Sequence, residues 1–328
     1  MAEFAGIEVK SGAITRHWLP LSDVPGAPRL PLILVGGTKA GPTMLVTSGI
    51  HGDEYDGFEA ALRLTESVNP EDLAGVLAVI PRVNVRAFDQ GRRWSSLDGL
   101  DLNRQFPGIR DGFMGQRLAW FMTNVLLRGV DFVLDFHGGT SELEVCSYGA
   151  VVAPSPLKEE LQPLLAVQHI WDWAETVGMK GTFMDMAEAA GIPFAIVEIG
   201  GNNTWRERPV MDGVHAGRNL MRYLGMINGA YEGIPSKQYV MRGTFIHAEA
   251  DGFLRPKVEL GAHVEQGQLL AEVFDLIGQK LYEVRSDVKG IVNDIRTQPS
   301  VHCGEWLYMV GRVIEMLDID QAGLARRG

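Results

Sequence analysis

The sequence has little cysteine, no long apolar run and no excess of positive charge. Cys146 and Cys303 are its two cysteines among 328 residues, with no CxxC spacing, so neither a disulfide framework nor a thiolate zinc site is expected. No run of about 18 apolar residues is present, and the N-terminus lacks a basic segment followed by an apolar one. We therefore expect no signal peptide and no membrane span, and predict a cytoplasmic protein.

The net charge argues against nucleic acid as a partner. It is −11, from 30 Lys and Arg against 41 Asp and Glu, and no basic cluster with interleaved aromatics stands out, so the field of the protein opposes a polyanion. A small anionic substrate remains compatible with this net charge, because a few arginines that converge on a pocket can make the local electrostatic potential positive. A homo-oligomer is also compatible with the sequence.

Short apolar segments alternate with amphipathic ones from about residue 30 to 225. Strands rich in Val, Ile and Phe and ended by Gly, Pro or Asn are predicted over residues 30–36, 43–49, 76–84, 130–138, 147–154 and 193–201. Apolar residues spaced by three and four predict helices over residues 55–68, 112–129, 155–178 and 209–226. This alternation predicts an α/β fold with a mixed central sheet and helices on both faces.

The pattern changes after about residue 235, where helical periodicity disappears and turn residues separate short alternating segments. The boundary is predicted within residues 231–238. We therefore expect a first domain over residues 1–232, with a short N-terminal β extension, and a small all-β C-terminal module over residues 239–328.

The segment GIHGDEYDG, residues 49–57, lies between a predicted strand and a predicted helix. His51 and Glu54 are three residues apart in this turn, so both can point to one spot beyond the carboxyl end of the strand, where open α/β sheets place ligands. Imidazole and carboxylate are good zinc ligands, but a catalytic zinc site normally has three protein ligands plus water. A third ligand is therefore expected at the end of another strand.

His137 is that third candidate, because it ends the strand predicted over residues 130–138 and precedes two glycines. Asp135 lies two residues earlier, so on a strand its carboxylate shares a face with the imidazole and could accept the N–H that does not face the metal. His51, Glu54 and His137 form a His₂Glu set, which hydrolytic zinc enzymes use while leaving a position for water. The sequence thus predicts one zinc ion per chain.

Glu198 is a carboxylate at the end of the otherwise apolar strand predicted over residues 193–201. A buried strand rarely carries an unpaired charge, and a general base needs a pKa near working pH, which partial burial provides. We predict that Glu198 is the base for water and then the acid for the leaving amine.

Residues 91–108 form a predicted loop that contains Arg93, Asn103 and Arg104. A guanidinium suits a carboxylate or a developing oxyanion, and an asparagine amide adds direction without charge. Arg92, beside Arg93, could take the same role. An ordinary solvated loop with a salt bridge is the alternative for these residues.

The motifs GIHGDE, DLNRQFPG, DFHGG and VEIGG, in this order, resemble the succinylglutamate desuccinylase/aspartoacylase family, within the group of zinc carboxypeptidase-like folds. The resemblance covers roughly residues 30–230, and the C-terminal module is similar to one that bacterial members carry. It implies zinc on His51, Glu54 and His137, and Glu198 as general base and acid.

The resemblance also assigns the loop residues. It implies that Asn103 and Arg104 bind a substrate carboxylate and that Arg93 polarises the scissile carbonyl. It further implies a tyrosine near the substrate, for which the open candidates are Tyr55, Tyr148 and Tyr308.

Three functions compete on this basis. The first is a zinc-dependent amidohydrolase that removes a succinyl, acetyl or aspartyl-type group from a small N-acyl amino acid or related compound. The second is a metallocarboxypeptidase acting on peptides or a glutamyl tail. The third is a carrier or binding protein, because the C-terminal module resembles biotinyl/lipoyl-type hybrid folds; Lys280 is its candidate attachment lysine, but no typical attachment sequence surrounds it.

Overall fold

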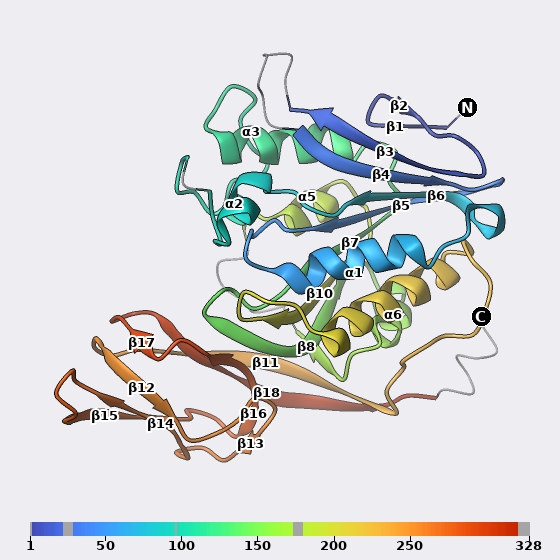
Figure 1. Cartoon of the computed structure of the whole chain (residues 1–328). Helices are drawn as coiled ribbons and strands as arrows, with labels where there is room; N and C mark the ends of the chain where they lie inside the picture. The colour runs from blue at the N-terminus through green and yellow to red at the C-terminus, as the bar shows by residue number, and fades with distance from the viewer. Residues whose placement is uncertain (1, 22–28, 96, 173–179, 321–328) are drawn as a thin grey trace.

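A computed structural model describes residues 2–21, 29–95, 97–172 and 180–320, and its central feature is a twelve-stranded mixed sheet (Figure 1). In spatial order its strands are β13 (His263–Val264), β16 (Gly290–Arg296), β18 (Trp306–Asp318), β11 (Lys237–His247), β9 (His169–Trp171), β8 (Leu143–Val152), β10 (Phe194–Gly201), β7 (Phe132–His137), β5 (Lys39–Ser48), β6 (Ala74–Ile80), β4 (Arg29–Gly36) and β3 (Ala13–Pro20). Two short strands, β1 (Glu3–Phe4) and β2 (Ile7–Glu8), pair separately near the N-terminus.

The middle of the sheet is parallel and buried. Strands β5, β7 and β10 are adjacent and parallel, and all six residues of β7 are buried. Their register places Glu198 beside His137, and Phe136 beside Ser48. The carboxyl ends of three strands therefore meet at one edge of the sheet, where ligands bind in folds of this kind.

Helices cover both faces of the sheet, which confirms the predicted α/β architecture. One face packs against α1 (Tyr55–Glu66), α4 (Leu157–Leu161), the 3₁₀ turn η4 (Gln162–Leu165) and α6 (Glu207–Tyr223). The other face packs against α3 (Met114–Phe121), the π-helical turn η3 (Met122–Leu126) and α5 (Phe183–Ala189). The remaining helical segments, in loops, are η1 (Pro70–Asp72), α2 (Val85–Gln90) and η2 (Leu102–Arg104). No helix in the described residues combines the length and apolar character needed to cross a membrane.

The helix predicted over residues 155–178 is wrong over residues 166–172. The helical part ends at Leu165, and Ala166 has a left-handed φ of 56°. The chain then forms β9, which pairs in parallel with both β8 and β11. Long-range strand pairing thus overrides the local helical spacing of apolar residues. Residues 173–178 of the predicted helix lie outside the described residues.

The C-terminal segment is all-β, as predicted, and it contributes to two sheets (Figure 1). The smaller sheet holds β15 (Lys280–Arg285), β14 (Leu269–Phe274), β12 (Gly252–Pro256) and β17 (Ser300–Val301). The other C-terminal strands extend the central sheet, since β11 pairs with β9 and β16 pairs with β8. The C-terminal strands are therefore joined by backbone hydrogen bonds to the sheet that carries His137 and Glu198.

Candidate active site

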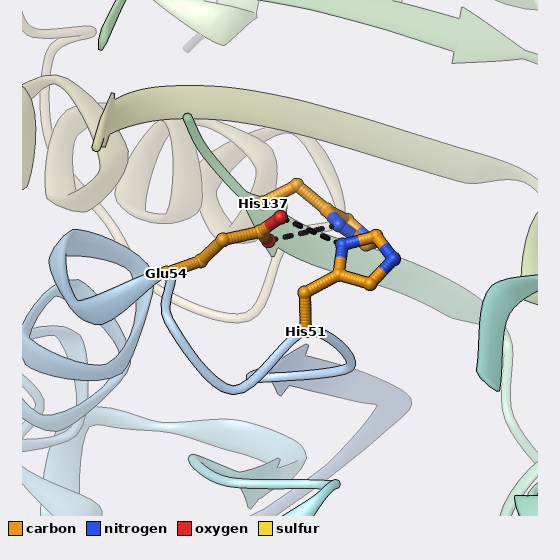
Figure 2. Close-up of side chains that lie close together, drawn as sticks. All are labelled: His51, Glu54 and His137. Atoms are coloured by element: carbon orange, nitrogen blue, oxygen red, sulfur yellow. Dashed lines mark hydrogen bonds and ion pairs between the residues drawn. The ribbon is translucent and has the colours of Figure 1, made fainter. Parts of the chain in front are cut away.

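His51 and Glu54 lie in the connection between β5 and α1, at the carboxyl edge of the sheet. Gly49 turns the chain at the end of β5 with a φ of +68°, a conformation that glycine adopts without strain. Both side chains are buried, and His51 Nδ1 lies 2.6 Å from Glu54 Oε1 (Figure 2). The two residues therefore face each other across the turn, as their spacing predicts.

His137 completes the cluster from the end of β7. Its Nδ1 lies 3.1 Å from Glu54 Oε2, and its ring centre is 5.0 Å from that of His51 (Figure 2). One ligand atom from each of His51, Glu54 and His137 lies within 4.8 Å of the others. A Cβ on Gly138 would lie 2.2 Å from the carbonyl oxygen of Ile199, so the glycine after His137 permits the close approach of β7 and β10 there.

The three side chains fit a divalent metal ion. Glu54 Oε2 is buried and accepts no hydrogen bond from the described part of the chain, although His137 Nδ1 lies close to it. Burial by itself would raise the pKa of Glu54, but the charges of His51 and His137 outweigh it and hold that pKa at about 2. Two imidazoles and an ionised carboxylate are a donor set of catalytic zinc sites.

Asp135 lies behind His137, as the sequence predicts. Its Oδ2 is 3.0 Å from His137 Nε2, and its Oδ1 accepts a 2.7 Å hydrogen bond from the hydroxyl of Thr47. Burial alone would lower the pKa of His137, but the carboxylates of Asp135 and Glu54 outweigh burial and raise it. The contact leaves His137 Nδ1 directed at the cluster.

Asp101 has the corresponding position behind His51, and the sequence analysis did not single it out. Its Oδ1 lies 3.2 Å from His51 Nε2 and also accepts a hydrogen bond from the backbone N–H of Asn103. Burial would raise the pKa of Asp101, but His51 and then Arg93 outweigh it and lower that pKa. Asp101 is the N-cap residue of η2, and aspartate at such a position is a capping signal in the sequence. That signal places Asp101 at the start of η2 but does not indicate its contact with His51.

A pocket of about 310 Å³ opens beside the cluster. Its wall includes the three cluster residues together with Arg93, Asn103, Arg104 and Glu198. The structure thus brings all seven predicted ligand, catalytic and substrate-binding residues to one pocket. Arg92 is exposed and does not line the pocket wall.

Glu198 occupies the pocket wall from β10, and its side chain makes no hydrogen bond to any described residue. Burial raises the pKa of Glu198 to about 8; the carboxylates of Glu54 and Asp294 add to the rise, whereas His137 and Arg93 oppose it. A carboxyl group with this pKa can exchange a proton near neutral pH.

The loop residues present their polar groups to the same pocket. Arg93 Nη1 lies 3.9 Å from Glu54 Oε1. Asn103 Oδ1 accepts a hydrogen bond from the backbone N–H of Phe183, and the Arg104 guanidinium donates to the carbonyl oxygen of Asn103. These contacts fix the side chain of Asn103 and the direction of Arg104.

Part of the pocket wall comes from the C-terminal strands, which the sequence analysis did not place there: Phe245, His247, Asp294 and Trp306. Phe245 and Trp306 stack with ring centres 4.8 Å apart.

One of the three candidate tyrosines also lines the pocket, namely Tyr148 on β8. The hydroxyl of Tyr55 donates to the carbonyl of Phe88, and that of Tyr308 donates to the carbonyl of Leu270 in the core of the C-terminal strands.

Residues 40–224 match the family model of the succinylglutamate desuccinylase/aspartoacylase catalytic domain. The chain belongs to this family. The matched range spans the cluster, the loop with Arg93 and Arg104, and Glu198. The resemblance proposed from the four motifs is thereby confirmed.

Named members of the family match over nearly the whole chain. The chain is 29% identical to N-alpha-acetyl-L-2,4-diaminobutyric acid deacetylase of Halomonas elongata, over 89% of this chain and 88% of that protein. The product-bound structure of the ectoine utilization protein EutE (DoeB) of Ruegeria pomeroyi is similar with a TM-score of 0.84 and 26% identity, covering 93% and 97% of the two chains. A succinylglutamatedesuccinylase/aspartoacylase of Rhodobacter sphaeroides gives a TM-score of 0.83 and 25% identity, covering 94% and 98%. The relatives therefore share the C-terminal strands as well as the catalytic domain.

Proposed function

We propose that this protein is a zinc-dependent amidohydrolase that removes the acyl group from a small N-acyl amino acid. The observation that carries the proposal is the convergence of His51, Glu54 and His137 in one pocket with the carboxyl group of Glu198. The family membership supports hydrolysis of an amide bond. We assign the catalytic domain to residues 1–232 and the module that completes its pocket to residues 239–328.

Each of the pocket residues has a separate role in the proposed reaction. Zinc on His51, Glu54 and His137 would supply a Lewis acid and lower the pKa of water. Glu198 takes a proton from the attacking water and later gives one to the leaving amine. Arg93 donates hydrogen bonds to the carbonyl oxygen as negative charge develops on it.

Asn103 and Arg104 supply the binding site for a carboxylate. The Arg104 guanidinium carries the charge, and the Asn103 amide, anchored by Phe183, adds a directed donor. A substrate held there by its α-carboxylate presents its acylated amine to the metal cluster. The Halomonas relative makes N-α-acetyl-L-2,4-diaminobutyrate the first candidate substrate, with succinyl and aspartyl-type acyl groups as further candidates.

The shape of the pocket favours a deacylase over a carboxypeptidase. The stacked Phe245 and Trp306 stand in the wall of a pocket of about 310 Å³, which suits a small ligand better than an extended peptide. A metallocarboxypeptidase needs an open groove for the rest of its substrate. Assays with C-terminal dipeptides therefore distinguish a carboxypeptidase from a deacylase.

The test is a panel of N-acyl amino acids and C-terminal dipeptides assayed with the purified protein. We expect hydrolysis of N-acyl amino acids, its loss on chelation, and its return when zinc is added. The Glu198→Ala variant should keep its metal content and melting temperature while kcat falls by two to four orders of magnitude. Preferred cleavage of dipeptides would favour the carboxypeptidase, and chelation without effect would contradict the metal-dependent mechanism.

A further inference from the structure

Asp294 is a buried carboxylate in the wall of the active-site pocket that the proposed reaction does not use. It lies on β16, is 6% exposed and is paired in register with Val145 on β8. Strand β8 in turn pairs with β10, which carries Glu198. Asp294 is therefore two strand spacings from β10, roughly 10 Å between backbones.

Asp294 has no cationic partner among the described residues. Within the described part of the chain, its carboxylate accepts one hydrogen bond, from the side-chain amide of Asn293 at 3.3 Å. Burial raises the pKa of Asp294 to about 8, and the hydrogen bond from Asn293 opposes that rise only in part. By contrast, the carboxylate of Glu54 lies against His51, and that of Asp101 lies against His51 and Arg93. Buried carboxylates are normally paired with a cation or a hydrogen-bond donor. A ligand that enters the pocket can supply the partner that Asp294 is missing.

We propose that Asp294 binds an amino group on the side chain of the substrate, so that the pocket selects N-acyl diamino acids over neutral and acidic N-acyl amino acids. This inference rests on the proposed function, because the acylated amine and the carboxylate are placed by the zinc ligands and by Asn103 with Arg104. Asp294 would then be the third anchor, on the C-terminal side of the pocket.

The surroundings of Asp294 suit a short cationic side chain. Phe245 and Trp306 offer stacked aromatic surface in the same wall, which contacts methylene groups and attracts an ammonium ion. The ammonium group pairs with the carboxylate of Asp294, which has no cationic partner in the described protein. Both charged groups are desolvated in the same contact.

The test compares substrates that differ in one charge. N-α-acetyl-L-2,4-diaminobutyrate and N-acetyl-L-norvaline have side chains of nearly the same shape, and N-acetyl-L-glutamate carries the opposite charge. We expect the wild-type kcat/KM to be highest for the cationic substrate. In Asp294→Asn that advantage over norvaline should shrink by about tenfold to hundredfold, mainly through KM. Asp287→Asn, an exposed change of the same charge in the same module, should leave the ratio unchanged.

Isothermal titration calorimetry with L-2,4-diaminobutyrate and L-norvaline tests the cation site without catalysis. Both ligands are titrated into the wild type and into Asp294→Asn. Tighter binding of the diamino acid, lost in Asp294→Asn, supports the site even if no N-acyl amino acid is hydrolysed, in which case the proposed function fails alone. Hydrolysis with the same substrate ratio in wild type and Asp294→Asn, and equal binding of the two amino acids, would overturn the inference and leave the proposed function standing.

Discussion

The guanidinium of Arg93 donates two hydrogen bonds to Asp101, from Nε at 3.2 Å and from Nη2 at 3.0 Å. The same carboxylate reaches His51 Nε2 through its other oxygen. Asp101 therefore connects the proposed metal ligand to the arginine assigned to the carbonyl oxygen. Both groups are held by one side chain of the loop that also carries Asn103 and Arg104.

Asp101→Asn should weaken both functions that Asp101 connects. The amide keeps the shape of the carboxylate but loses the charge that holds Arg93 and faces His51. We expect zinc affinity or kcat/KM to fall about tenfold to hundredfold, the usual effect of losing a partner behind a metal ligand. Asp98→Asn in the same loop, whose carboxylate accepts from Gly115 and Leu100, is the control and should change stability more than zinc affinity. Equal zinc affinity and equal kcat/KM in Asp101→Asn would contradict this role.

Zinc binding should depend on His137 and, to a lesser extent, on Asp135. His137→Ala removes a ligand and is expected to abolish stoichiometric zinc, measured by metal analysis after dialysis. Asp135→Asn keeps the ligand but weakens the contact that orients it, so zinc affinity should fall about tenfold to hundredfold. Thr47→Val removes the hydrogen bond to the other oxygen of Asp135 and should have a smaller effect. A His137→Ala protein that retains one zinc ion per chain would exclude this ligand.

Asp294 should lower the stability of the protein at high pH. Its pKa is 3.8 as an ordinary aspartate and about 8 in the folded chain, so the folded state binds the proton more tightly. The contribution of Asp294 to stability is then most favourable below pH 4, falls as the pH rises toward 8, and stays reduced above it. Asp294→Asn removes this dependence. Its melting temperature should exceed that of the wild type by more at pH 9 than at pH 5, and a constant difference between the two proteins would contradict the prediction.

The turn after Glu198 should not accept a side chain at Gly200. Gly200 has a φ of +67°, and a Cβ there would lie 1.9 Å from Asp56 Oδ2, which accepts a hydrogen bond from the N–H of Gly201. We expect Gly200→Ala to lower the free energy of unfolding by about 3 kcal/mol or more. Gly191→Ala is a matched control, because its φ is +70° but no atom lies within 4 Å of the added Cβ. That control should cost about 1–2 kcal/mol, and equal losses in urea unfolding would show that backbone strain alone is responsible.

The convergence of the proposed ligands and of the proposed base could be predicted because the local sequence marks the strand ends that carry them. His51, His137 and Glu198 all follow buried apolar runs and precede glycines, so their side chains were expected at one sheet edge. The C-terminal wall could not be predicted in this way. Asp294 is brought to the pocket by the pairing of β16 with β8, between residues far apart in the chain, and no local pattern encodes that register. Strand β9 was missed for the same reason.

The uninterrupted hydrogen bonding from β3 through β9 to β18 affects how a ligand reaches the site. Phe245 and Trp306 belong to strands of that same ladder, so they cannot swing away as a separate body unless several backbone hydrogen bonds break together. The backbone that carries these two side chains is consequently held in place by the sheet. We therefore expect the bulk and charge of the side chains on β11, β16 and β18, rather than a hinge motion of the backbone, to select which molecules enter there.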